Sequence, residues 1–115
     1  MYFCSSFKYL PIVMDEQTRE DIKKACQVLR EGGVILYPTD TIWGLGCDAS
    51  NSDAVRRIFR IKQREDSKSM LMLLDSDAKL NSYVPDIPDI AYDLIDMAER
   101  PLTIVYDNVR YVAPE

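Results

Sequence analysis

The chain has 115 residues, enough for one domain of ordinary size. Hydrophobic residues make up 47% and charged residues 29%, a globular composition that excludes disordered and collagen-like proteins. The longest unbroken apolar run has five residues, far below the roughly 18 to 20 that cross a bilayer, so no membrane association is expected. The formal net charge of −5 argues against non-specific binding of nucleic acid by the chain as a whole.

The spacing of the cysteines and the absence of histidine exclude several kinds of metal site and catalytic site. Cys4, Cys26 and Cys47 are scattered without metal-binding spacing, which predicts reduced thiols in a cytoplasmic protein and no tightly bound metal. The N-terminal residues lack the apolar core of a secretory signal. The chain has no histidine, so catalytic triads and general bases built on histidine are excluded.

The first predicted elements are a helix and a strand. Residues 15–31 carry apolar side chains every three or four positions, as on one face of a helix. Thr18 and Asp21 resemble a capping box near its start, and Gly32–Gly33 supplies its end. The β-rich run at 34–37 does not alternate, which predicts a strand buried on both faces.

The rest of the chain continues this alternation. We expect helices at 51–62, 76–83 and 86–98, strands at 69–74 and 102–106, and a turn at Asp107–Asn108 that leads the last strand into 110–112. Helices alternating with strands predict an α/β fold with parallel neighbouring strands. In such sheets ligands bind beyond the carboxyl ends of strands, which directs attention to the loop after Tyr37.

That loop, from Pro38 to Asp48, holds the first group of candidate functional residues. It carries two hydroxyls, a carboxylate, a flat ring and two glycines: Thr39, Thr41, Asp40, Trp43, Gly44 and Gly46. Glycines let backbone groups approach a ligand, and hydroxyls offer short, orientable hydrogen bonds. The competing interpretation is an ordinary turn, with threonine and aspartate capping the backbone and the tryptophan in the core. The loop matches neither the P-loop nor the GxGxxG pattern.

The second group is basic. Six of the fourteen basic residues lie between Arg56 and Lys68. Lys62 and Arg64 converge only if the helix ends between them; they then supply a point charge and a bidentate fork suited to a phosphate chain. The competing interpretation is a solvated basic helix end that favours the helix dipole. A local cationic surface on an acidic chain fits a confined anion better than a long polyanion.

Two further features are predicted to be structural. Asp86, Asp89, Asp93 and Asp96 form a solvated acidic helix face without a metal. Cys47 is expected to be a small buried residue because no histidine accompanies it.

Together, these segments resemble one known family. In order, the chain contains GGVILYPTDTIWGLGCDA, AVRRIFRIKQRE and PLTIVY, and over residues 20–106 it resembles the YrdC-like family of L-threonylcarbamoyladenylate synthases. The resemblance implies a twisted, open mixed α/β sheet with helices packed on it. It also implies a nucleotidyltransferase that uses ATP with Mg²⁺ to join L-threonine and bicarbonate into threonylcarbamoyl-AMP, for N6-threonylcarbamoyladenosine in tRNA. The implied macromolecular partners are tRNA or double-stranded RNA and tRNA-modification proteins.

The resemblance also implies roles for individual residues. Thr39 is expected to contact substrate threonine, and Thr41, Trp43 and Gly44 to line the same pocket. Lys62 and Arg64 form the catalytic, nucleotide-binding pair that holds the carbamoyl and phosphate groups, and Arg57, Arg60 and Lys68 are the expected RNA-binding residues.

Departures from the family pattern leave competing interpretations open. Glu65 stands where the family has proline, Ser69 where a Lys-Pro-Leu turn leads the strand, and Trp43 where tyrosine is usual. These favour the YciO-like branch. The family domain normally continues further, so residues 14–115 are predicted to be the N-terminal part of a YrdC-like domain, weak or inactive alone, with 1–13 as an extension. The alternatives are a non-catalytic module that binds double-stranded RNA or a nucleotide, and an incomplete domain that forms a homo-oligomer through its sheet edge.

Overall fold

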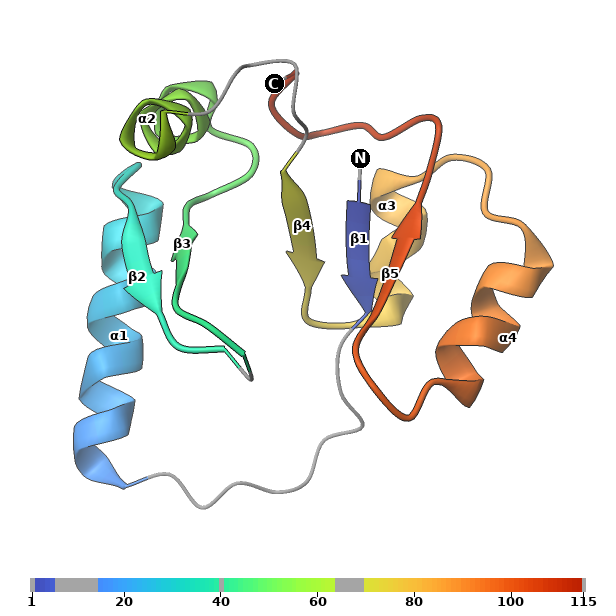
Figure 1. The fold of residues 1–115 in the computed structure, drawn as a ribbon, viewed down its shortest axis with the longest axis horizontal. Coiled ribbons are helices and arrows are strands. Elements are labelled where there is room, and N and C mark those ends of the chain that lie inside the picture. The colour runs from blue at the N-terminus through green and yellow to red at the C-terminus, as the bar shows by residue number, and fades with distance from the viewer. Residues whose placement is uncertain (1, 6–14, 40, 64–69, 115) are drawn as a thin grey trace. The chain divides into compact units, whose positions relative to one another are not determined.

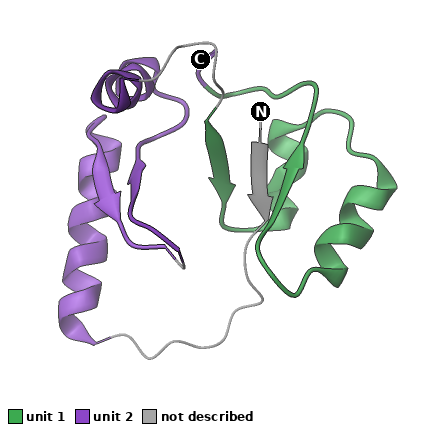
Figure 2. Cartoon of the chain, viewed as in Figure 1, with its two compact units in different colours: residues 1–10, 69–112 green, residues 11–68, 113–115 purple. Residues whose placement is uncertain are grey.

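The computed structural model of the chain describes residues 2–5, 15–39, 41–63 and 70–114 (Figure 1). The chain divides into two compact units, one of residues 1–10 and 69–112 and the other of residues 11–68 and 113–115 (Figure 2). We call them the sheet unit and the hairpin unit. None of the helices in the described part of the chain is long and apolar enough to cross a membrane.

The sheet unit is built on three strands in the order β4 (Leu71–Leu74), β1 (Tyr2–Ser5) and β5 (Leu102–Val105) (Figure 1). β1 runs parallel to β4 and antiparallel to β5. The predicted mixed α/β architecture is therefore confirmed, as are the strands predicted at 69–74 and 102–106. The neighbour of β5 is antiparallel, however, and not parallel as expected. The sequence patterns did not predict β1, which falls in the segment expected to be an extension.

Short helices follow β4 in this unit and contribute to its core. η1 (Asp77–Lys79) and α3 (Leu80–Tyr83) occupy the predicted helical stretch at 76–83, and α4 (Asp89–Met97) occupies most of 86–98. α4 begins later than predicted because Pro88 takes an extended conformation as its N-cap. The buried side chains of the unit lie on these helices, on β4 and on the segments beside them: Met72, Leu80, Val84, Ala91 and Tyr106.

The segment after β5 does not form the strand expected at 110–112. The backbone N–H of Arg110 donates to the carbonyl of Tyr83 at 2.8 Å, at the end of α3. The backbone N–H of Arg110 is therefore not available to pair with β5, as a strand at 110–112 would require. The turn after β5 leads the chain toward the helices of the unit.

In the hairpin unit, α1 (Glu16–Arg30) confirms the first predicted helix, but its cap differs from the prediction. The Asp15 side chain accepts a hydrogen bond from the Thr18 N–H at 2.7 Å, so Asp15 is the N-cap and the predicted capping box at Thr18 is wrong. Hydrogen bonding from Thr18 lowers the pKa of the Asp15 carboxyl below its ordinary value. The predicted end is confirmed: Gly32 has a φ of 78°, and its N–H donates to the Leu29 carbonyl.

After α1 the chain forms an antiparallel hairpin of β2 (Ile35–Tyr37) and β3 (Gly44–Gly46). β2 was predicted as a strand, but not with an antiparallel neighbour. The side chain of Leu36 is 64% exposed, so the prediction that this strand is buried on both faces is wrong. Two short strands form a narrow ribbon that leaves the Leu36 side uncovered.

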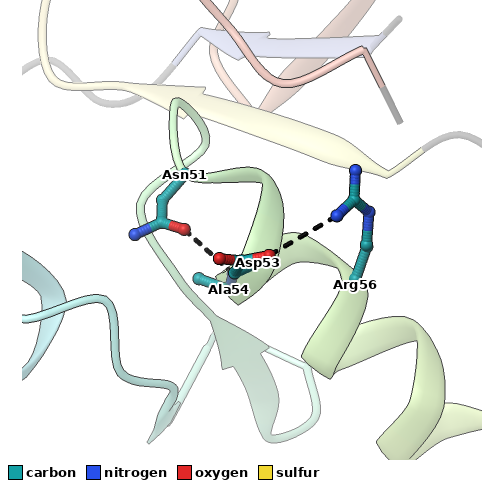
Figure 3. A network of polar contacts seen from close by, with 4 residues as sticks. All are labelled: Asn51, Asp53, Ala54 and Arg56. Atoms are coloured by element: carbon teal, nitrogen blue, oxygen red, sulfur yellow. Dashed lines mark hydrogen bonds and ion pairs between the residues drawn. The ribbon is translucent and has the colours of Figure 1, made fainter.

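α2 (Ser52–Lys62) supplies the core of the hairpin unit. The Asn51 side chain caps the helix by accepting from the Ala54 N–H at 3.1 Å, and Arg56 donates to Asp53 at 3.4 Å (Figure 3). The helical period of residues 51–62 predicts one stripe. Lys62 at the end of this stripe is exposed, whereas its apolar members are buried: Ala54, Val55, Ile58 and Phe59.

Candidate functional site

The loop between β2 and β3 is held together by one hydroxyl. The Thr39 hydroxyl oxygen accepts hydrogen bonds from the backbone N–H groups of Thr41 at 3.2 Å and Ile42 at 3.1 Å. It also hydrogen-bonds to the Ile42 carbonyl, and it lies 3.4 Å from the Thr41 hydroxyl. A side chain that hydrogen-bonds to the backbone two and three residues further along the chain fixes the conformation of a turn. The threonine cap that belongs to the competing, ordinary-turn interpretation is thereby confirmed.

The side chains next to this fixed turn face solvent. Trp43 is 65% exposed and Ile42 is 77% exposed, and Thr41 is exposed as well. The interpretation that Trp43 belongs to the core is therefore wrong. The loop instead exposes both the indole ring of Trp43 and the side chain of Thr41. The Thr39 hydroxyl is engaged in hydrogen bonds within the loop. Its direct contact with substrate threonine stays a prediction. Asp40 lies outside the described residues.

Gly44 lies opposite Tyr37 in the hairpin register. A β-carbon built at Gly44 would lie 3.0 Å from the Tyr37 ring, so glycine leaves room for that ring. The sequence predicted that Gly44 lines a pocket, which stays a prediction. It did not single out Tyr37. The signal available was its position immediately before the Pro38–Thr39 turn.

The second predicted group lies at the end of α2. Lys62 is the last residue of the helix, and Gln63 follows in the left-handed conformation with a φ of 50°. The helix therefore ends where convergence of Lys62 and Arg64 requires it to end. Lys62 is exposed, and none of the described carboxylates forms an ion pair with it. Arg64 and Lys68 lie outside the described residues, so the pairing of Lys62 with Arg64 stays a prediction.

The other cations of α2 form an exposed face. Arg57 and Arg60 are exposed, one turn apart. Neither forms an ion pair with a residue that the structure describes, whereas Arg56 lies 3.4 Å from Asp53. Two cations on one turn of a helix are available to an anionic partner.

The predicted acidic face of α4 is also solvated. Asp89, Asp93 and Asp96 are exposed, as is Asp86 before the helix. In the described part of the chain, no three cysteine, aspartate or glutamate residues gather as a metal site.

Comparison with known proteins identifies the family. Residues 27–115 match the family model Sua5/YciO/YrdC, which is described as "Telomere recombination". This match covers most of the chain. The chain belongs to the Sua5/YciO/YrdC family. The resemblance seen in the sequence is thereby confirmed, and the match includes both the hairpin loop and α2.

Several curated Sua5/YciO/YrdC relatives bear the name threonylcarbamoyl-AMP synthase. The protein of Pseudomonas aeruginosa (strain UCBPP-PA14) is 44% identical over 69 residues, which cover 60% of this chain and 37% of that protein. The Halorhodospira halophila protein is 37% identical over 67 residues, 58% of this chain and 35% of that protein. The Hydrogenovibrio crunogenus protein is 41% identical over 63 residues, 55% of this chain and 34% of that protein.

The chain thus spans little more than a third of the length of the curated Sua5/YciO/YrdC relatives that it matches. No solved structure matches it.

Cys47 directly follows Gly46, the last residue of β3, and is half-buried. Burial raises the pKa of its thiol, and the neighbouring Asp48 carboxylate raises it further. Since the thiolate is the reactive form, a raised pKa keeps the Cys47 thiol protonated near neutral pH and makes its reaction with electrophiles slow. This agrees with the structural role predicted for it.

We expect iodoacetamide at pH 8 to modify the exposed Cys26 several-fold faster than Cys47, as measured on peptides by mass spectrometry. In a Cys26→Ser variant, the rate at Cys47 should keep rising as the pH increases through its raised pKa. Urea should abolish the protection. Faster labelling of Cys47 than of Cys26 in the folded protein would show that Cys47 is an activated thiol.

Proposed function

We propose that this chain takes part in forming threonylcarbamoyl-AMP from L-threonine, bicarbonate and ATP, for the N6-threonylcarbamoyladenosine modification of tRNA. The observation that carries the proposal is the hairpin loop, in which a turn fixed by Thr39 displays the Thr41 hydroxyl and the Trp43 ring. Support also comes from family membership and from relatives named threonylcarbamoyl-AMP synthase.

In the proposed reaction the threonine amine captures bicarbonate to give a carbamate and water. A carbamate oxygen then attacks the α-phosphorus of ATP, a new P–O bond forms, and the bond to the leaving pyrophosphate breaks. The protein has to hold two anions together and neutralise the charge that grows on the phosphates. Lys62 and Arg64 carry that task. Mg²⁺ enters with ATP as part of the substrate and screens the phosphate oxygens.

The hairpin loop is assigned to the amino-acid side of this reaction. The Thr41 hydroxyl can both donate to and accept from the hydroxyl of a bound threonine. The Trp43 ring covers the methyl group of the same ligand. Neither group has to move a proton in the chemical step. Their role is to bind and orient threonine.

Titration calorimetry with L-threonine and with L-valine tests this proposal. Valine has nearly the shape of threonine but lacks the hydroxyl, so we expect L-threonine to bind and L-valine to bind more weakly. Thr41→Val should weaken L-threonine binding by about 2- to 12-fold, the loss expected for one neutral hydrogen bond. Ile42→Ala, at the more exposed neighbouring position, serves as the matched control and should leave the affinity nearly unchanged. Equal affinity for the two amino acids would contradict the assignment.

A second candidate function is a non-catalytic module that binds double-stranded RNA or a nucleotide, and exposed Arg57 and Arg60 favour it. Contacts between these cations and phosphates would make the affinity fall steeply with salt concentration. The calorimetry separates the two functions. A chain that binds double-stranded RNA but no L-threonine would support the module and contradict the synthase.

A further inference from the structure

The ring of Tyr37 rests on the two glycines of the strand opposite. Tyr37 pairs directly with Gly44, and Gly46 pairs with Ile35 two residues further from the loop. A β-carbon at Gly44 would lie 3.0 Å from Cζ and 3.2 Å from the hydroxyl oxygen of Tyr37. A β-carbon at Gly46 would lie 2.9 Å from Cε1 and 3.4 Å from Cδ1 of the same ring. One ring therefore spans both glycines.

This contact explains why glycine occupies both positions. Neither Gly44 nor Gly46 has a positive φ, so the backbone does not require glycine at either one. The space favours glycine instead: a β-carbon at Gly46 would require the rigid Tyr37 ring to shift, and one at Gly44 would fit tightly against the far end of that ring. Glycine in a strand commonly marks such a close approach.

The contact also fixes the base of the loop. Tyr37 is the last residue of β2 and Gly44 is the first of β3, so the ring joins the strands at the point where the loop leaves them. A hairpin with three residues in each strand and two glycines in one of them is weak by itself. The Thr39 hydroxyl stabilises the turn through hydrogen bonds to its backbone, and the Tyr37 ring packs where the two strands enter and leave the turn.

We propose that Tyr37 is a positioning residue for the loop, acting through Gly44 and Gly46 to fix how Thr41 and Trp43 are presented. That the loop holds threonine rests on the proposed function; the positioning itself does not. The hydroxyl oxygen of Tyr37 lies near Gly44 alone, whereas carbon atoms of the ring approach both glycines, so we expect the ring to be sufficient for this role.

Trp43 reports on this role directly, because it is the only tryptophan in the chain. We expect Tyr37→Ala to lower the fluorescence anisotropy of Trp43 without any ligand and to weaken L-threonine binding about tenfold. Tyr37→Phe should restore both values. Leu36→Ala is the matched control: it removes the neighbouring, 64% exposed side chain from the opposite face of β2 and should change neither value.

Gly46→Ala provides a test that leaves Tyr37 in place, and it remains informative if Tyr37→Ala does not fold. The added methyl displaces the ring, so the anisotropy should fall as in Tyr37→Ala. If Tyr37→Ala is folded, the double variant should show little more effect than either single one, because both act on the same contact.

Unchanged anisotropy in both single variants would overturn the proposal, as would a Tyr37→Phe variant as impaired as Tyr37→Ala. If the anisotropy changes as expected but no variant or parent binds L-threonine, the positioning role stands and the proposed function fails.

Discussion

Replacing Phe59 with alanine is expected to lower the free energy of unfolding by about 3–5 kcal/mol. The Phe59 side chain is only 2% exposed, beside the equally buried Ile58 on α2. This helix supplies most of the buried side chains that the structure describes in the hairpin unit. Since small domains are stable by only about 5–15 kcal/mol, the loss is a large part of the total.

The matched control is Ile61→Ala on the same helix. Ile61 is 54% exposed, so its truncation should change the unfolding free energy by no more than about 0.5 kcal/mol. Urea unfolding followed by circular dichroism measures both variants. Equal destabilisation by the two substitutions would mean that the apolar stripe of α2 is not the core of this unit.

Replacing Lys62 with alanine is expected to weaken ATP binding by about 10- to 100-fold, the range for losing a hydrogen bond from a charged group. Lys62 is exposed at the C-terminal end of α2, where its charge adds only about 0.3–1 kcal/mol to the helix. The melting temperature should therefore change little. Calorimetry with MgATP and a thermal melt of the same sample provide the two measurements.

Lys24→Ala is the control for the loss of a positive charge, because Lys24 is an exposed lysine on α1 of the same unit. It should leave both the ATP affinity and the melting temperature unchanged. A large fall in melting temperature together with unchanged ATP affinity in Lys62→Ala would make Lys62 a structural residue. The assignment of the phosphate site to the end of α2 would then fail.

The helices could be predicted from the sequence because their signals are local. The apolar positions of α2 recur within one turn, and the same positions are buried in the structure. The end of α1 was equally clear, since Gly32 adopts the left-handed conformation that most other residues avoid. The capping error at Thr18 arose because Asp15, three residues earlier, offers a competing side-chain acceptor.

Strand pairing could not be predicted in the same way, because it depends on residues far apart in the chain. β3 consists of Gly-Leu-Gly, which has low strand propensity and no alternating pattern to recognise. It forms by pairing with β2, in a register that places both glycines close to the ring of Tyr37. β1 likewise becomes a strand by pairing with β4 and β5, which follow much later in the sequence.

The features of the candidate site also fall into those that local sequence predicts and those that depend on tertiary contacts. The sequence alone determined the family, the residue types of the loop, and the end of the basic helix at Lys62, since these follow from residue order and local backbone preference. Only the tertiary structure decided that Trp43 faces solvent, that the Thr39 hydroxyl is used within its own turn, and that Tyr37 rests on Gly44 and Gly46. The physical reason is that exposure and cross-strand contact depend on which segment lies opposite, and no local pattern of side chains encodes that.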